Sequence, residues 1–159
     1  MATPDPDAAA LLAEYRRVVD EAAIRDLAAR YCWAIDTLDR EAFGRVFTPD
    51  ATALLGNSHH DGIDDIWSKV DTTLSPLTCS QHLIGSQVVD LGPDGDTATH
   101  RCQFHAQHVR EGTSTEGGSQ FVVAGSYTDD VVRTADGWRI RHRVLAVSWT
   151  TGNPRVTRP

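Results

Sequence analysis

Five side chains in this sequence could carry acid–base chemistry if the fold brings them together. Asp36 lies near the end of an N-terminal helical pattern, and His82, His108, Tyr127 and Arg143 each fall on a different strand-like segment. A neutral imidazole suits proton abstraction near neutral pH, and a carboxylate can fix its tautomer. A guanidinium or a phenol can stabilise a developing oxyanion. The residue types therefore indicate proton transfer without a cofactor.

The elements that must position these residues follow from the hydrophobic pattern. Apolar residues recur at helical spacing over about 8–38, which predicts two helices or one bent helix. Two shorter helices are predicted at 40–47 and 61–74. The predicted strands cover residues 51–55, 79–91, 97–110, 119–133 and 138–150, and Gly- and Asp-containing turns separate the four long ones.

Helices followed by long, turn-linked strands are typical of an α+β fold with helices on one face of an antiparallel sheet. The 159 residues predict one domain, long enough to enclose a pocket. We expect a disordered leader at 1–7, one domain at 8–151, and an irregular tail at 152–159 at a subunit interface.

Alternation along each strand predicts which side chains share the inside. His82, His108, Tyr127 and Arg143 each fall on the more apolar face of their strand, which is the composition of a small-molecule pocket. A single β-bulge would reverse such an assignment. The expected pocket-lining residues are Trp33, Cys32, Phe104, Phe121, Val123, Tyr127 and Trp149.

Composition excludes several classes of protein. The formal net charge is −7 and no basic stripe is present, which argues against nucleic-acid binding. The three cysteines are widely separated and form no CxxC, so neither a zinc ribbon nor a disulfide framework is indicated. No secretory signal or membrane-spanning apolar run is visible, and we expect a cytoplasmic protein without membrane partners.

Candidates for metal or nucleotide sites are weak. His59, His60 and Asp61 fall in a predicted polar loop without a third ligand at suitable spacing. His105 and His108 lie on opposite faces of one strand and cannot chelate one ion together. The sequence contains no GxSxG, P-loop or GxGxxG motif. We therefore expect neither a metal nor an organic cofactor.

The order of these features resembles the SnoaL-like branch of the nuclear-transport-factor-2-like superfamily. The matching segments are residues 23–31 with Asp36, 47–51, 81–85, 125–129, and 136–140 leading into Arg143. The resemblance implies a cone-shaped α+β barrel in which a curved sheet wraps around N-terminal helices. It also implies a homo-oligomer, either a trimer or a dimer.

Within that superfamily the chain is most similar to scytalone dehydratase, bile-acid 7α-dehydratase and hexachlorocyclohexane dehydrochlorinase. The resemblance implies that Asp36 and His82 form the catalytic pair, that Arg143 and Tyr31 assist, and that His108 is a second catalytic histidine. Ile35 stands where scytalone dehydratase has a tyrosine, so scytalone itself is not the expected substrate.

The expected activity is that of a dehydratase-like lyase acting on a hydrophobic cyclic molecule such as a polyketide, terpenoid or steroid-like metabolite. His82 would abstract a proton, and His108 or Tyr127 would protonate the leaving group. Two alternatives stay open because this fold hosts many functions. One is a polyketide cyclase or isomerase, and the other is a non-catalytic binding module.

Overall fold

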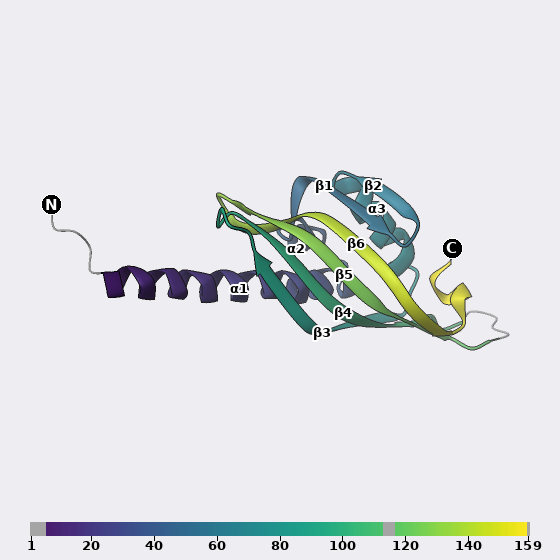
Figure 1. The fold of residues 1–159 in the computed structure, drawn as a ribbon. Helices are drawn as coiled ribbons and strands as arrows, with labels where there is room; N and C mark the ends of the chain where they lie inside the picture. Colours follow the sequence, from purple (N-terminus) through teal and green to yellow (C-terminus); the bar gives the residue numbers. More distant parts are fainter. Residues whose placement is uncertain (1–5, 113–116, 159) are drawn as a thin grey trace.

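The computed structural model describes residues 6–112 and 117–158, which form two layers (Figure 1). The helical elements are α1 (Pro6–Asp36), α2 (Arg40–Gly44), α3 (Ile63–Leu74) and the 3₁₀ turn η1 (Pro154–Thr157). The strands are β1 (Phe47–Leu55), β2 (Ser58–Asp61), β3 (Cys79–Leu91), β4 (Thr97–Val109), β5 (Gln120–Thr134) and β6 (Gly137–Gly152).

The six strands form one curved sheet in the order β2-β1-β6-β5-β4-β3. All neighbours are antiparallel except β1 and β6, which run parallel. The sheet does not close on itself, because β2 and β3 are its two edges. The C-terminal half of α1 packs against β3, and α3 packs against β1. The predicted α+β class is confirmed. The cone is completed by the helices that pack on the sheet and not by pairing between the two edge strands.

Helix α1 is one continuous helix of 31 residues rather than two. It begins at Pro6, inside the predicted leader, while residues 1–5 lie outside the described residues. Its C-terminal half buries Ile24, Leu27, Tyr31 and Ile35 in the core. Its N-terminal half projects away from the body (Figure 1). None of the helices described is long and apolar enough to cross a membrane.

Two predicted loops have regular structure. His59 and His60 lie in β2, which pairs with β1, and not in a polar loop. The tail after β6 turns back on its own chain: Asn153 caps η1 by accepting a hydrogen bond from the Arg155 N–H, and Val156 is buried. The pairing of β2 escaped the sequence pattern because a four-residue strand shows too little alternation.

A bulge between β5 and β6 controls which side chains face the concave side. Ala124 pairs with Trp149 and the next residue, Gly125, pairs with Val147, so β6 carries one extra residue there. A Cβ at Gly125 would lie 2.0 Å from the Ala146 carbonyl oxygen, so only glycine allows this close approach. The bulge leaves Val147 inside and turns Trp149 to the outer face.

Candidate functional site

A cavity of about 230 Å³ lies between the concave face of the sheet and helices α1 and α3. Most of its wall is apolar, and the polar groups that reach it are two histidines, two tyrosines, two threonines and one lysine. The lining residues are Tyr31, Ile35, Leu55, Gly56, Lys69, Val70, Thr73, Leu74, His82, Phe104, Ala106, His108, Val123, Tyr127, Leu145, Val147 and Thr157. Such a wall suits a small apolar molecule with a few aimed polar contacts.

Asp36 and His82 form a hydrogen-bonded pair at one side of this cavity. His82 Nδ1 lies 2.6 Å from Asp36 Oδ1, and the His82 backbone N–H donates to Asp36 Oδ2 at 2.8 Å. The hydroxyl of Ser80 donates to Asp36 Oδ1 at 2.7 Å. Because a carboxylate only accepts, the Nδ1 of His82 carries the proton and its Nε2 has a free lone pair. The exposed fractions of the His82 and Asp36 side chains are 7% and 16%.

The local sequence explains why Asp36 can make these contacts. It is the last residue of α1, and β3 is an edge strand next to that helix. The carboxylate therefore binds a β3 backbone N–H that no further strand covers. Burial alone raises the pKa of Asp36, but hydrogen bonds from His82 and Ser80 outweigh it and hold the pKa below its ordinary value. Asp36 is thus a carboxylate that orients His82.

His108 is a hydrogen-bond acceptor in the cavity. Its Nδ1 lies 3.3 Å from the Phe121 carbonyl oxygen, so that nitrogen must carry the proton. Burial, with the nearby His82 as a second cause, lowers its pKa to about 4, so the ring is neutral near pH 7. Its ring centroid lies 5.6 Å from that of His82. The cavity therefore has two adjacent imidazoles, each with a free Nε2 lone pair.

Arg143 does not line the cavity. Its guanidinium is fully buried and makes two hydrogen bonds to Asp129, of 2.7 and 2.8 Å. It lies between the rings of Tyr31 and Tyr127, 4.2 Å from each centroid. Burial raises the pKa of both tyrosines, so their phenols stay protonated. Arg143 thus supports two tyrosines that form the wall.

A buried polar chain extends from Arg143 and was missed from the sequence. Asp129 Oδ2 lies 3.2 Å from His100 Nδ1, and His100 Nε2 lies 3.1 Å from Gln87 Oε1. Asp129 and His100 pair across β4 and β5 on the inner face. The same strand alternation that selected Tyr127 and His108 selects these two residues, so that signal was present. They stabilise the buried charge of Arg143 away from the cavity.

The structure separates several predicted pocket residues from the cavity. Trp33 is 73% exposed on the outer side of α1, and Trp149 lies on the outer face of the sheet against His105. Cys32 is buried beside Asp36 and borders an external groove between α1 and β3 rather than the cavity. The ring centroid of Phe121 lies 6.4 Å from that of His108, and Phe121 is not among the lining residues. Phe104, Val123 and Tyr127 do line the cavity.

Neither buried thiol nor a metal cluster adds chemistry here. Burial raises the pKa of Cys32 to about 12 and of Cys102 to about 11, so both stay protonated. In residues 6–112 and 117–158, no three His, Cys, Asp or Glu side chains are grouped to hold a metal ion. The ionisable groups of the described cavity are therefore those of the dyad, His108, the two phenols and Lys69.

Solved structures share this fold over nearly the whole chain. A protein from Kribbella flavida is 25% identical, with a TM-score of 0.81 over 90% of this chain and 99% of that one. A protein from Novosphingobium aromaticivorans provisionally described as a scytalone dehydratase has a TM-score of 0.78 at 20% identity, over 88% and 91%. A hexachlorocyclohexane dehydrochlorinase from Novosphingobium barchaimii has a TM-score of 0.75 at 15% identity, over 89% and 94%.

The sequence comparisons identify the family. The terrestric acid biosynthesis cluster protein E of Penicillium crustosum is 31% identical over 137 residues, which cover 84% of this chain and 86% of that protein. The model of the SnoaL-like domain matches residues 16–144, which contain Asp36, His82, His108 and Arg143. The chain therefore belongs to the SnoaL-like family and has the fold of the nuclear-transport-factor-2-like superfamily.

Proposed function

We propose that this protein is a cofactor-independent, dehydratase-like lyase. The observation that carries the proposal is the 2.6 Å contact between Asp36 Oδ1 and His82 Nδ1 at the wall of an apolar cavity. That contact leaves the His82 Nε2 lone pair as a base against a mostly apolar wall. The fold is shared with a dehydrochlorinase and with a protein described as a dehydratase, which supports an elimination.

In the proposed reaction, His82 Nε2 removes a proton from a carbon next to a carbonyl group of the substrate. Asp36 stabilises the imidazolium that forms, as the acid does in a serine-protease triad. The electron pair moves into the carbonyl to give an enolate, and collapse of the enolate expels a β-hydroxyl group. The phenols of Tyr31 and Tyr127 are the donors for the enolate oxygen and for the departing hydroxyl, with Arg143 holding both rings.

His108 is not the proposed proton donor to the leaving group, although the sequence left that role open to either His108 or Tyr127. A neutral ring with a pKa of about 4, whose proton is on Nδ1, offers a lone pair and no proton at Nε2. It would accept a hydrogen bond from a substrate hydroxyl and so position it. Tyr127 is therefore the proposed proton donor.

The cavity size narrows the proposed substrates. A volume of about 230 Å³ suits a compact molecule of one or two rings better than a steroid, since pockets for drug-sized ligands measure about 300–1,000 Å³. A hydroxylated cyclic ketone of polyketide or terpenoid origin fits the proposed chemistry. The relative that belongs to a terrestric acid biosynthesis cluster supports a role in secondary metabolism.

A polyketide cyclase or isomerase is the second candidate. The pair of Nε2 lone pairs on His82 and His108 favours it, because two acceptors could shuttle a proton between two carbons without expelling a leaving group. A binding module is the third, and it predicts ligand binding without either reaction.

The test uses a panel of cyclic β-hydroxy ketones of one or two rings, incubated with the protein in D₂O and followed by mass spectrometry. Loss of one water supports the lyase, and deuterium uptake next to the carbonyl without water loss supports the isomerase. We expect His82→Ala and Asp36→Asn to lower the rate by roughly 10²–10⁴-fold, the usual contribution of general-base catalysis.

The matched control is His105→Ala, which removes an exposed imidazole from the outer face of β4. It should keep the wild-type rate. Full activity of both dyad variants would show that another group is the base. Calorimetric binding of a panel compound with neither water loss nor deuterium uptake would assign the cavity to binding alone.

A further inference from the structure

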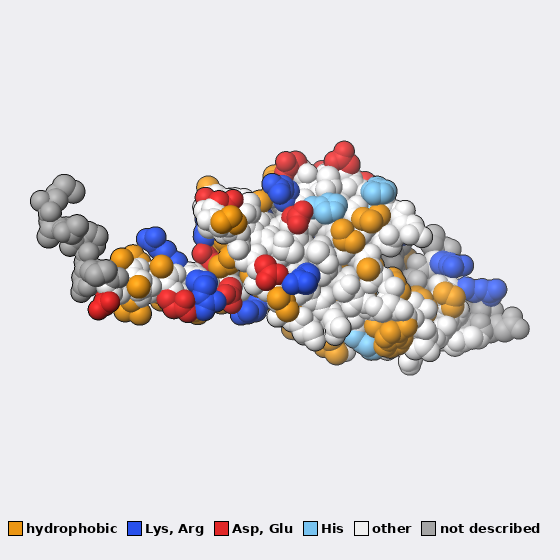
Figure 2. Space-filling model, in the orientation of Figure 1, with side chains coloured by type: hydrophobic (Ala, Val, Ile, Leu, Met, Phe, Trp, Pro, Cys, Tyr) orange, Lys and Arg blue, Asp and Glu red, His pale blue; other side chains and the backbone are white. Residues whose placement is uncertain are grey.

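The projecting half of α1 carries large apolar side chains that nothing in the described chain covers. All side chains from Asp7 to Val19 are exposed, with exposed fractions of 72% for Leu11, 65% for Tyr15 and 52% for Val18. Leu12 and Val19 are exposed as well. Figure 2 shows hydrophobic side chains along this projection, among charged ones. We call Leu11, Leu12, Tyr15, Val18 and Val19 the N-terminal stripe.

The stripe is not an extension of the face that packs on the sheet. At 3.6 residues per turn, the buried positions Ile24, Leu27 and Tyr31 lie on one side of α1, and the same side reaches Asp20 one turn earlier. The stripe lies roughly half a turn away from that side. The helix therefore has one apolar side for its own body and an opposite one for a separate contact.

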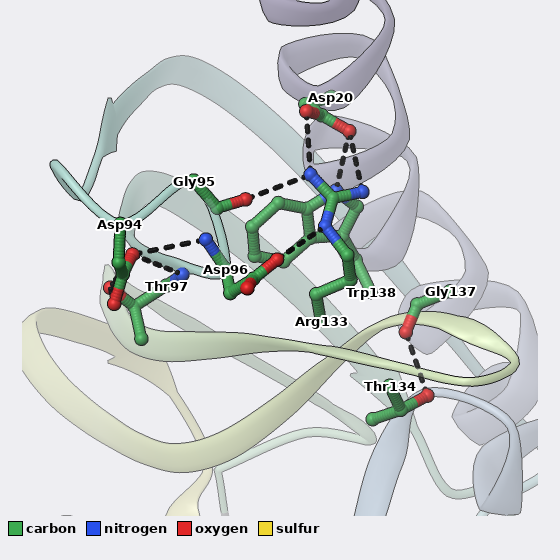
Figure 3. Close-up of polar contacts among 9 residues, drawn as sticks. All are labelled: Asp20, Asp94, Gly95, Asp96, Thr97, Arg133, Thr134, Gly137 and Trp138. Atoms are coloured by element: carbon green, nitrogen blue, oxygen red, sulfur yellow. Dashed lines mark hydrogen bonds and ion pairs between the residues drawn. The ribbon is translucent and has the colours of Figure 1, made fainter.

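The body holds α1 firmly where the projection begins (Figure 3). Asp20 accepts hydrogen bonds from Arg133 at 2.7 and 3.0 Å and from Trp138 Nε1 at 3.0 Å. Arg133 also binds Asp96 and the Gly95 carbonyl in the β3–β4 turn, and its guanidinium lies 4.4 Å from the Trp138 ring centroid. The projection thus leaves the body in a fixed direction, with its stripe presented to solvent.

The stripe is symmetric about Tyr15 along the sequence. Leu11 and Val19 are equally far from Tyr15, and so are Leu12 and Val18. When two copies of one helix lie antiparallel and cross at Tyr15, position 15 meets its own copy, 11 faces 19, and 12 faces 18. Every apolar side chain of the stripe then faces another one. A two-fold interface must be self-complementary in this way.

Small residues continue the stripe at both of its ends. Ala8 and Ala22 lie on the same side of α1 as the stripe and are equally far from Tyr15, and their small, exposed side chains let the two backbones approach closely. Glu14 lies beside the stripe and binds Arg17 of its own helix, so it does not depend on the second copy. An antiparallel second copy therefore matches the apolar and small residues on this side of the helix.

We propose that the protein forms a two-fold dimer through an antiparallel pair of α1 projections that cross at Tyr15. The pairing also accounts for the length of the projection, because an isolated helix of this size is only marginally stable in water. In the dimer the N-terminal end of each projection reaches the partner's helix where that helix meets its own body.

The first test is symmetric crosslinking in a Cys79→Ser background, because Cys79 is exposed while Cys32 and Cys102 are buried. Tyr15→Cys should crosslink to its own copy with a short bis-maleimide, since the two positions meet on the two-fold axis. Ala13→Cys is the matched control: it lies on the opposite side of the same helix and should remain uncrosslinked. Equal crosslinking of the two variants, or none with Tyr15→Cys, overturns the proposal.

The second test measures mass by sedimentation equilibrium at micromolar concentrations. The wild-type chain and Ala13→Glu should be dimers, and Tyr15→Glu should be a monomer with an unchanged thermal midpoint for its body. A monomeric wild type overturns the proposal. So does an oligomer that survives Tyr15→Glu but dissociates with Trp149→Glu, because that would place the interface on the outer face of the sheet.

Discussion

At the scale of single residues, the cavity depends on proton positions that neighbouring acceptors impose. Asp36 keeps the proton of His82 on Nδ1, and the Phe121 carbonyl does the same for His108. Both rings therefore present Nε2 lone pairs, although one is backed by a carboxylate and the other by a neutral carbonyl. In the proposed mechanism only His82 has a carboxylate beside its ring to balance a positive charge, so the two histidines are given different roles.

The lowered pKa of His108 predicts a pH dependence of stability. Its pKa is about 4 in the fold, against about 6.5 in an unfolded chain, so the unfolded state binds more protons between these values. The stabilisation is complete above about pH 6.5 and is lost as the pH falls to about 4. It is on the order of 3 kcal/mol at most. Urea denaturation across this range should show stability falling with pH.

His108→Gln should flatten that pH dependence, because glutamine does not titrate. The control is His105→Gln, which changes an exposed histidine on the same strand and should leave the dependence as in the wild type. The carboxylates Asp36 and Asp129, with pKa values below their ordinary range, lose their own stabilisation only at lower pH. An equal pH slope in His108→Gln would contradict the assignment.

At the scale of elements, the bulge between β5 and β6 sets the composition of the cavity wall. The Gly125 position lets the Ala146 carbonyl approach, and Val147 rather than Trp149 then faces inward. If the Trp149 side chain pointed inward, it would fill much of a cavity of about 230 Å³. The bulge is thus what leaves room for a ligand.

Gly125→Ala should destabilise the protein by about 1–3 kcal/mol, the usual cost of forcing extra atoms into a packed region, because its Cβ would lie 2.0 Å from the Ala146 oxygen. The control is Gly85→Ala in β3, where a Cβ meets nothing within 4 Å. Thermal midpoints of the two variants measure the difference. Equal midpoints would show that the bulge can relax without cost.

Strand alternation predicted much of the site, and bulges limited it. In β3 and β4, alternation placed His82, Phe104 and His108 on the concave face, where the structure has them. In β6 the prediction was right for Arg143 and wrong for Trp149, because the extra residue lies between them. A bulge depends on backbone contacts between strands far apart in sequence, so a single strand's pattern cannot reveal it.

Helical spacing explains the other differences. Tyr31 and Ile35 lie four residues apart and share the buried side of α1, whereas Trp33 between them points outward. The apolar residues of 11–19 and those of 24–35 continue one helical spacing in the sequence, but the two groups lie on opposite sides of the helix. The helical spacing within each group was predicted correctly. The angle between the two groups around the helix axis is what indicates a second contact surface.

At the scale of the whole molecule, the C-terminal tail completes the cavity. Val156 is buried and Thr157 is part of the cavity wall, although both follow the last strand. The side-chain amide of Asn153 donates to the Gly118 carbonyl at 2.8 Å and holds the turn in place. The tail therefore acts as a cover that belongs to the same chain as the dyad.

Val156→Asp should detach this cover, because a buried carboxylate without a partner costs several kcal/mol. We expect earlier trypsin cleavage at Arg155 and stronger fluorescence of a dye that binds apolar cavities, while the rest of the fold stays intact by circular dichroism. Arg155→Asp changes an exposed neighbour and is the control for dye binding. Unchanged dye fluorescence in Val156→Asp would show that the cavity is open without the tail's release.

The bonds that Asp36 makes to β3 bear on how relatives of this protein should be interpreted. Two of its three hydrogen bonds, from the His82 backbone N–H and the Ser80 hydroxyl, do not need an imidazole at position 82. A descendant that lost its chemistry by replacing His82 would still need the carboxylate to cover the edge strand. Selection for folding alone could therefore preserve an aspartate at the end of α1 in inactive members. Under the proposed mechanism, the histidine, and not the aspartate, is the residue that marks an active descendant.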